Sequence, residues 1–284
     1  MEYREFDPHP ALKPYVENFW QMSGISSCEQ VIVPDGNTGL MFVGNGVFRS
    51  QADGQGFVDM SGRAVVVGQK SRPARYRFGS TDRFGTFGVR FRPAGLAVFT
   101  GISPVSLVDR VVAAESLFGP ESIVADNNIR NAKQPATMVY ETNRLLLRCF
   151  KGADPRQQIA EQMAGMIFRK HGHYQAEHWV RHFGISERQI ERLFRQYIGL
   201  RPKTFARIVR FNHSIVQHNY RPQQRMTDLA YATGYYDQMH FIKEVKAFTR
   251  QTPKTYFQGH PGSWSGILKN ILSKHFGSQN PALG

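Results

Sequence analysis

The last third of this chain contains the same helix-turn-helix pattern twice. The two copies cover residues 175–201 and 226–257. In each copy a short segment with helical apolar spacing ends at a glycine, Gly184 or Gly234. A polar residue, Ser186 or Asp237, then begins a longer amphipathic segment. This layout is typical of domains that place the second helix in the major groove of DNA. The repeat therefore predicts two recognition helices in one chain.

A connecting helix is predicted between the two copies. From Pro202 to about His218 the apolar residues recur at helical spacing, and a helix of that length spans roughly 25 Å. The recognition helices are predicted to begin at Glu187 and Gln238. A connector of this length allows them to face successive turns of DNA, about 34 Å apart. One chain is thus predicted to read a site of two helical turns.

The charge of the chain is concentrated around the repeat. Residues 154–260 carry 17 Lys and Arg against 8 Asp and Glu, whereas residues 1–153 carry 17 against 14. Basic side chains that neutralise phosphates release counterions and supply much of the affinity for DNA. A basic surface also serves solubility or binds acidic proteins, so the charge gains weight only because it coincides with the repeat.

The length and composition of the chain limit the number of domains, the expected location and the use of its cysteines. A chain of 284 residues predicts two domains, because a common domain size is about 100–150 residues. No run of about 18 uncharged apolar residues occurs and the first ten residues do not resemble a secretory signal, so no membrane association is predicted and the cytoplasm is the expected location. Cys28 and Cys149 are far apart and form no CxxC, which disfavours a disulfide framework or a zinc ribbon.

The first hundred residues have the pattern of a β-rich domain. Runs of β-branched and aromatic residues bounded by Gly, Asn and Asp occur at residues 30–49, 63–70, 74–79 and 85–92. Short strands at this spacing predict a small sandwich or barrel. The pattern then becomes helical, with helices predicted to start at Pro93 and to include residues 116–129 and 138–150. Gly152 to Pro155 is the predicted linker, and Pro155 is placed to begin the next helix.

A set of turn and core residues occurs in a fixed order across residues 155–258. The set is Gly184-Ile185-Ser186, Ile190, Leu193-Phe194-Arg195, Gly199-Leu200-Arg201-Pro202, Arg210, Leu229-Ala230, Gly234-Tyr235, Phe241 and Pro253-Lys254-Thr255-Tyr256. It resembles the DNA-binding domain of the AraC family of bacterial transcription regulators, and it is specific because all these positions recur in order. Three positions depart from the family pattern, namely Val180 in the first copy and Val245 and Arg250 in the second. These departures affect packing and capping.

The N-terminal half resembles the β-rich sensory domain of one branch of the same family. The matching segments are residues 15–21, 34–36, 88–104 and 107–119. The expected fold is α+β, with a cupin-like or barrel-like β-rich N-terminal domain that carries a helical extension and an all-α C-terminal domain with two helix-turn-helix motifs. The expected divisions are residues 1–119 for sensing and dimerisation, 120–154 for a helical linker region, 155–260 for DNA binding and 261–284 for an amphipathic C-terminal helix and tail. That last helix is expected to pack against its own domain.

The faces of the recognition helices that point away from the core are the candidate DNA contacts. In the first helix they are Arg188, Gln189, Glu191, Arg192 and Arg195, and in the second they are Gln238, Met239, Ile242, Lys243 and Lys246. Arg pairs with guanine, Gln with adenine, Glu accepts from cytosine, and Met or Ile meets a thymine methyl. The alternative for any single position is a phosphate contact or simple solvation. We expect the Arg-rich first helix to discriminate most bases and the second to add register and phosphate contact.

Other sets of side chains give weaker evidence for a metal, catalytic or ligand site. His178 and His182 have a helical i, i+4 spacing, but no further ligand completes a metal site, so neither a metal nor another cofactor is predicted. No nucleophile motif occurs, and no catalytic residue is predicted. Trp20, Phe42, Arg75, Tyr76, Arg90 and Arg92 are candidates for a small-molecule pocket, with core or surface packing as the alternative.

The predicted function is sequence-specific regulation of transcription. The resemblance implies promoter DNA and RNA polymerase as partners, favours activation, and allows a small-molecule effector and a homodimer. The alternatives are a DNA-architectural protein without an effector and a DNA-repair enzyme fused to the same module. The repair enzyme is disfavoured because neither Cys28 nor Cys149 has the Pro-Cys-His type of context of a sacrificial cysteine.

Overall fold

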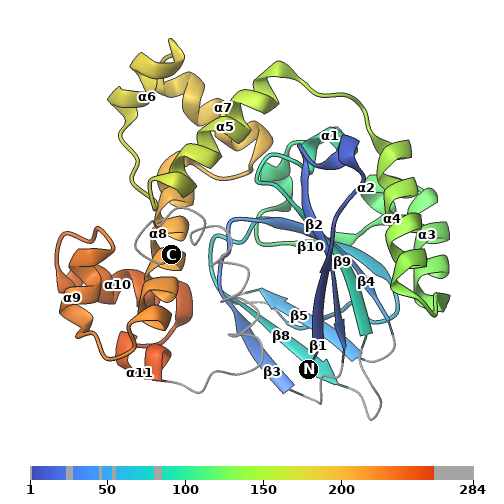
Figure 1. The fold of residues 1–284 in the computed structure, drawn as a ribbon, viewed down its shortest axis with the longest axis horizontal. Coiled ribbons are helices and arrows are strands. Elements are labelled where there is room, and N and C mark those ends of the chain that lie inside the picture. Colours follow the sequence, from blue (N-terminus) through green and yellow to red (C-terminus); the bar gives the residue numbers. More distant parts are fainter. Residues whose placement is uncertain (1, 24–27, 45–46, 53–55, 80–84, 259–284) are drawn as a thin grey trace.

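The computed structural model describes residues 2–23, 28–44, 47–52, 56–79 and 85–258. It contains a β-rich N-terminal domain and an all-helical C-terminal domain (Figure 1), which confirms the predicted α+β fold. The amphipathic helix expected within residues 261–284 lies outside the described residues. Within the described part of the chain, no helix has the length and apolar character needed to cross a membrane.

Two antiparallel sheets form the N-terminal domain. One has the strand order β1-β2-β9-β4-β7-β10 and the other has the order β3-β8-β5-β6. Their bounds are β1 Glu2–Phe6, β2 Val16–Ser23, β3 Cys28–Ile32, β4 Thr38–Val43, β5 Val47–Ala52, β6 Val58–Asp59, β7 Ala64–Val67, β8 Ala74–Gly79, β9 Gly85–Phe91 and β10 Val111–Ala113. The β-branched and aromatic runs in the sequence correspond to β3–β5, β7, β8 and β9.

The six-stranded sheet is buried on both faces. Successive side chains of a strand point to opposite faces, and Phe19 and Trp20 on β2 accordingly enter two different cores. The same alternation separates Leu40 from Met41 on β4. One face packs against helices and the other against the four-stranded sheet, which explains why β7 and the second half of β4 are continuous apolar runs instead of alternating with polar residues.

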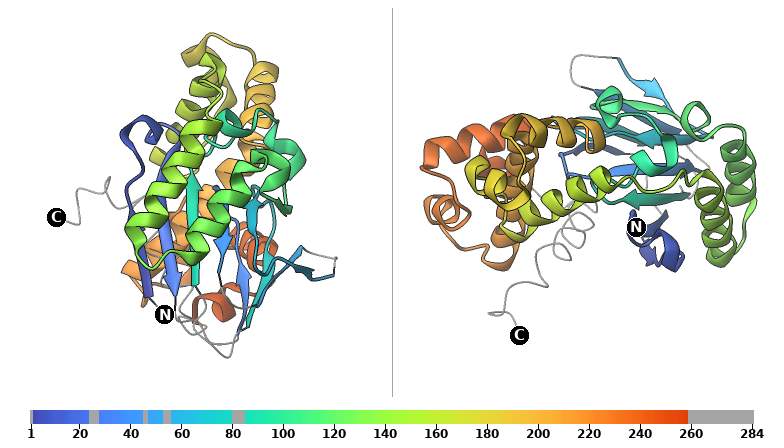
Figure 2. Two further views of the ribbon diagram at one scale, coloured as in Figure 1. Left: turned by 90° about the vertical axis from the view of Figure 1, so that its right-hand side faces the viewer. Right: turned by 90° about the horizontal axis from the view of Figure 1, so that it is seen from above.

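Short and long helices complete the N-terminal domain. They are α1 Ala97–Thr100, α2 Glu115–Phe118, α3 Glu121–Asn131 and α4 Pro135–Cys149, with 3-10 turns η1 Pro10–Leu12 and η2 Pro104–Leu107. Helices α3 and α4 cover the outer face of the six-stranded sheet (Figure 2), where Ile129 and Leu146 join its core. The helix predicted to start at Pro93 begins at Ala97, after a turn over residues 93–96 in which the Gly95 amide donates to the Arg92 carbonyl oxygen.

Seven helices form the C-terminal domain as described. They are α5 Pro155–Arg169, α6 Ala176–Phe183, α7 Glu187–Tyr197, α8 Pro202–Tyr220, α9 Met226–Ala232, α10 Gln238–Thr249 and α11 Pro253–Gln258. Helix α5 begins at Pro155 as predicted, and the side chain of its N-cap, Asp154, accepts a hydrogen bond from the Arg156 backbone. The Tyr197 hydroxyl also donates to Asp154, so the start of α5 is tied to the end of α7.

The two domains share apolar and polar contacts. Val33 and Ala94 of the N-terminal domain belong to the apolar core of the C-terminal domain. The Ala94 amide donates to Glu161 at 2.9 Å, and its carbonyl accepts from the Gln157 side chain at 3.1 Å. Helix α5 therefore satisfies both backbone polar groups of a buried residue in the other domain.

Helix α10 is attached to α8 by a carboxylate that is almost fully buried. Arg207 Nη2 lies 2.7 Å from Glu244 Oε1, and the Glu244 side chain is only 8% exposed whereas that of Arg207 is 45% exposed. We expect Arg207→Ala to lower the free energy of unfolding more than Glu244→Gln, because the first change leaves a buried carboxylate without its cation. The expected losses are about 3–5 and about 1–2 kcal/mol respectively, measured by urea denaturation. Equal losses in the two variants would contradict this assignment.

Candidate nucleic-acid interface

The first helix-turn-helix motif has the geometry that its sequence predicts. Helix α6 ends at Gly184, whose positive φ of 65° places it in the left-handed region that glycine favours. Helix α7 then begins with a capping box at Ser186, whose hydroxyl accepts from the Gln189 amide while the Gln189 side chain accepts from the Ser186 amide at 2.8 Å. The turn and the start of the recognition helix are thus fixed by local hydrogen bonds.

Helix α7 has one buried face and one solvent face. Ile190, Leu193 and Phe194 are buried, as predicted from their spacing. On the other face Arg188, Gln189, Arg192 and Arg195 are exposed, and Glu191 is half-buried. Because the Gln189 amide oxygen is engaged in the capping box, this residue stabilises the helix start in addition to any role at DNA. The three arginines form the basic surface of the first reader.

The turn of the second motif packs tightly against the segment that precedes α6. Helix α9 ends at Thr233, and Gly234 follows with a φ of 79°. A Cβ at Gly234 would lie 2.7 Å from His173 Nε2, so only glycine fits between this turn and the segment that precedes α6. Asp237 then caps α10 by accepting from the His240 amide at 2.6 Å.

Helix α10 presents a mixed polar and apolar surface. Phe241, Val245 and Phe248 are buried as predicted. The exposed side chains are Gln238, Met239, Lys243 and Lys246, and Ile242 is half-buried. Tyr236, at 86% exposure, stands next to the N-terminal end of this helix and was not among the predicted contacts. Its position between Gly234 and Asp237 in the turn is the sequence signal that identifies it.

The C-terminal end of α10 departs from ideal geometry. Arg250 occupies the position after the helix with a φ of 62°, in the left-handed region. The family places a glycine here in the resemblance described above, and a side chain at positive φ costs roughly 1 kcal/mol relative to glycine. Arg250 therefore adds backbone strain at the C-terminal end of α10, but it does not change where the helix ends.

Helix α8 holds the two motifs apart. Its 19 residues give a length of about 28 Å, slightly more than the sequence predicted. Figure 1 shows α6 and α7 at one end of α8 and α9 and α10 near the other. This arrangement is what two readers in successive turns of DNA need.

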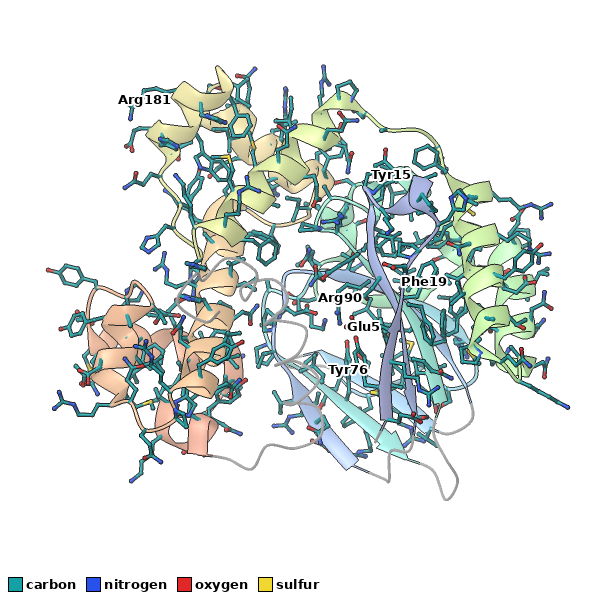
Figure 3. All side chains as sticks on the ribbon, viewed as in Figure 1. Glu5, Tyr15, Phe19, Tyr76, Arg90 and Arg181 are labelled. Atoms are coloured by element: carbon teal, nitrogen blue, oxygen red, sulfur yellow. The ribbon has the colours of Figure 1, made fainter. Side chains whose placement is uncertain are left out.

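The candidate pocket residues do not all lie in one place. Trp20, Tyr76 and Arg90 line a single cavity between the two sheets, and Figure 3 labels Tyr76 and Arg90 near the side of the β-rich domain that faces α8. Phe42 instead belongs to the core between the six-stranded sheet and α3. Arg92 is exposed and donates to the Lys13 carbonyl oxygen at 2.8 Å. Arg75 is also exposed.

The surroundings of the described histidine and cysteine side chains bear on metal binding and on thiol reactivity. Within the described ranges no three His, Cys, Asp or Glu side chains form a group that could hold a metal ion. His178 and His182 stack on the surface of α6 with ring centroids 6.2 Å apart. Burial raises the pKa of Cys149, which is the opposite of what a reactive thiolate requires.

Comparison with known proteins agrees with this geometry. Residues 179–259 match a family described as a helix-turn-helix domain, and residues 4–113 match a family described as a domain of unknown function. No curated protein matches the chain.

Among solved structures, ToxT from Vibrio cholerae is similar with a TM-score of 0.48 and 7% identity, over 86% of this chain and 99% of ToxT. A ToxT structure with bound unsaturated fatty acid has a TM-score of 0.47 and 8% identity, over 84% of this chain and 93% of that one. The AraC-like transcriptional activator CuxR has a TM-score of 0.33 and 14% identity, over 72% and 78%.

The capped recognition helices and the domain match define a DNA-binding protein of the helix-turn-helix class. More specifically, the C-terminal region is a helix-turn-helix domain of the AraC type, joined to an N-terminal β-rich domain.

Arg192 tests the assignment of the first reader. It is exposed on α7, away from the buried stripe, so its removal leaves the fold intact. We expect Arg192→Ala to weaken binding to the specific site by about 1–3 kcal/mol, while binding to unrelated DNA barely changes. A fluorescence anisotropy titration at fixed salt measures both affinities. Equal losses on the two DNAs would make Arg192 a phosphate contact.

His213 gives the C-terminal domain a defined response to acid. It stacks on His171 with ring centroids 4.1 Å apart, and burial, reinforced by the charges of His171 and His173, lowers the pKa of His213 to about 3. Because the unfolded chain binds this proton near pH 6.5, stability is full above that pH and is lost as pH falls. We expect the free energy of unfolding to fall by about 2 kcal/mol through this group between pH 7 and pH 5.

The matched variants are His213→Gln and His182→Gln, the latter on the exposed surface of α6. Denaturant unfolding at several pH values should show a shallower acid dependence in His213→Gln than in the wild-type protein or in His182→Gln. An unchanged slope in His213→Gln would mean that other groups cause the acid sensitivity.

Proposed function

We propose that this protein is a sequence-specific transcription regulator that activates promoters in response to a small-molecule effector. In this proposal, α7 and α10 enter the major groove, and the N-terminal domain senses the effector. The chain acts on DNA as a binding protein and has no catalytic step. Its expected place of action is the cytoplasm, where the DNA of a bacterial cell is found.

The observation that carries the proposal is the attachment of two capped recognition helices to one continuous helix. Phe205 of α8 packs against Phe194 of α7 with ring centroids 5.9 Å apart. Phe211 of α8 packs against Phe248 of α10 at 5.2 Å. A DNA-architectural protein has no need for two readers with a fixed separation, whereas a reader of two successive half-sites does.

The two exposed faces support unequal roles. We propose that Arg188, Glu191 and Arg192 read bases in the first half-site, since bidentate Arg contacts to guanine are the commonest specific contacts. Gln238, Met239 and Lys243 are proposed to read the second half-site more loosely, with Lys246 and Arg195 closer to phosphates. RNA polymerase and a second copy of the chain are the further partners proposed for activation.

Selection of binding sites from a random DNA pool with the full chain tests the proposal. We expect one motif with two conserved blocks about 10–11 base pairs apart, centre to centre. Arg192→Ala should relax the preference within one block, and Lys243→Ala should relax the other block to a smaller extent. Lys133→Ala, at an exposed position between α3 and α4 and outside both helix-turn-helix motifs, is the matched control.

The outcome also separates the alternatives. Enrichment of no motif, together with bending of unrelated DNA, would favour an architectural protein and refute sequence-specific regulation. A motif with a single block would refute the role proposed for α10.

A further inference from the structure

A cavity with charged groups in an apolar wall lies between the two sheets of the N-terminal domain. The empty space here is about 700 Å³ when the solvent at its open mouth is included. Trp20, Met22, Ile32, Met41 and Val67 supply the apolar wall. The charged groups that line it are Asp35, Lys70 and Arg90, so the lining has one excess positive charge.

Both cations are held in the protein interior. Arg90 is 8% exposed and Lys70 is also 8% exposed. Lys70 Nζ lies 3.7 Å from Asp35 Oδ1. Burial lowers the pKa of Lys70, but the charges of Asp35 and Tyr76 outweigh it, so the net shift is upward and the amine stays protonated. The Arg90 guanidinium lies beside the Tyr3 hydroxyl, which donates to Glu5.

Several polar atoms in the cavity wall need a partner. Arg90 Nη1, both side-chain polar atoms of Asn37 and the Thr38 hydroxyl are buried without a hydrogen-bond partner among the described residues. Buried polar groups are nearly always satisfied, because leaving one unpaired costs about 1–3 kcal/mol. Three neighbouring wall residues therefore carry polar atoms that no described protein group satisfies.

We propose that this cavity binds a small organic oxyanion, a carboxylate or a phosphate monoester on a compact apolar body, with Arg90 and Lys70 holding the oxyanion and Trp20 and Met41 contacting the apolar part. A planar guanidinium matches the oxygens of either head group, and the donors of Asn37 and Thr38 supply further hydrogen bonds. Asp35 competes with the ligand for Lys70. This inference rests on the proposed function, in which the N-terminal domain senses an effector.

The segment between β3 and β4 connects this cavity to the DNA-binding domain. Val33, Asp35 and Asn37 line the cavity, while Val33 also belongs to the core of the C-terminal domain. Between them, Gly36 packs so closely on α8 that a Cβ would lie 3.3 Å from the Phe205 ring. Phe205 in turn contacts Phe194 in the first reader. A ligand that draws Lys70 away from Asp35 therefore acts on a segment that touches Phe205 of α8, which packs against Phe194 of α7.

Direct binding measurements without DNA test the ligand class. The probes are phenylacetate, phenyl phosphate and the neutral analogue phenylacetamide, titrated calorimetrically into the full chain. We expect one or both anions to bind at least about tenfold more tightly than phenylacetamide, because a charge-assisted hydrogen bond is lost in the amide. The tighter anion identifies the head group.

Variants of the charged residues make the test specific. Arg90→Gln should weaken anion binding by about 10- to 100-fold. Arg92→Gln, at the exposed position directly after the same strand and outside the cavity lining, should leave it unchanged. Thermal melts of all variants check the fold.

Three results would overturn the inference. They are no binding of either anion at millimolar concentration, equal binding of phenylacetate and phenylacetamide, and equal effects of Arg90→Gln and Arg92→Gln. The coupling to α8 is read out by amide hydrogen exchange, in which bound anion should alter protection of residues 33–37 and of α8. A change confined to the strands would refute that step.

Failure of this inference is distinguishable from failure of the proposed function. Anion binding is measured without DNA, and selection of a two-block DNA motif is measured without an anion. If a two-block DNA motif is found but no anion binds, only the proposed ligand class is refuted. If an anion binds but no motif is found, the proposed role as a transcription regulator is refuted.

Discussion

Helix α8 is the element on which the rest of the structure depends. Twelve of its 19 residues are buried, a fraction that places it inside the C-terminal domain with neighbours on most of its circumference. Its aromatic side chains serve both motifs, Phe205 on the side of α7 and Phe211 on the side of α10. In the proposed function, a rigid helix between the two recognition helices fixes the length of the DNA site, because the second groove contact costs no further orientational freedom.

The N-terminal domain meets α8 through Gly36 and meets α5 through Ala94. These contacts are intimate where they occur: Gly36 lies against the Phe205 ring, and both backbone groups of Ala94 are bonded to α5. Tight packing transmits a displacement instead of absorbing it. The cavity wall includes the residues on either side of Gly36, so in our proposal a bound effector acts on α8 through this segment.

Local interactions account for the parts of the structure that the sequence predicted well. The capping box of Ser186 and Gln189, the left-handed Gly184 and the buried stripe of Ile190 and Phe194 all depend on residues within one or two helical turns. Spacing along the chain is enough to recognise them. The strand runs were equally visible, since β-branched residues at both faces of a buried sheet leave a continuous apolar pattern.

The cavity was only partly predictable. Trp20, Tyr76 and Arg90 stood out as aromatic or basic residues in strands, but Phe42, from the same kind of pattern, points to the opposite face of its sheet. Asp35 and Lys70 are not among the predicted pocket residues, because their pairing across the fold has no sequence signature. The sequence likewise does not predict the burial of Glu244, since a charged side chain on an amphipathic helix is normally assigned to solvent.

The sequence by itself determined the secondary structure of the readers, the turn between the helices of each motif and the class of the C-terminal domain, since these follow from short-range spacing, capping and turn conformation. The tertiary structure alone decided which face of each strand meets the cavity, which charges are buried together and where the β-rich domain touches α8. Those features join residues separated by tens or hundreds of positions, such as Asp35 with Lys70 and Gly36 with Phe205. Burial and charge pairing are properties of the packed chain, and no local pattern encodes them.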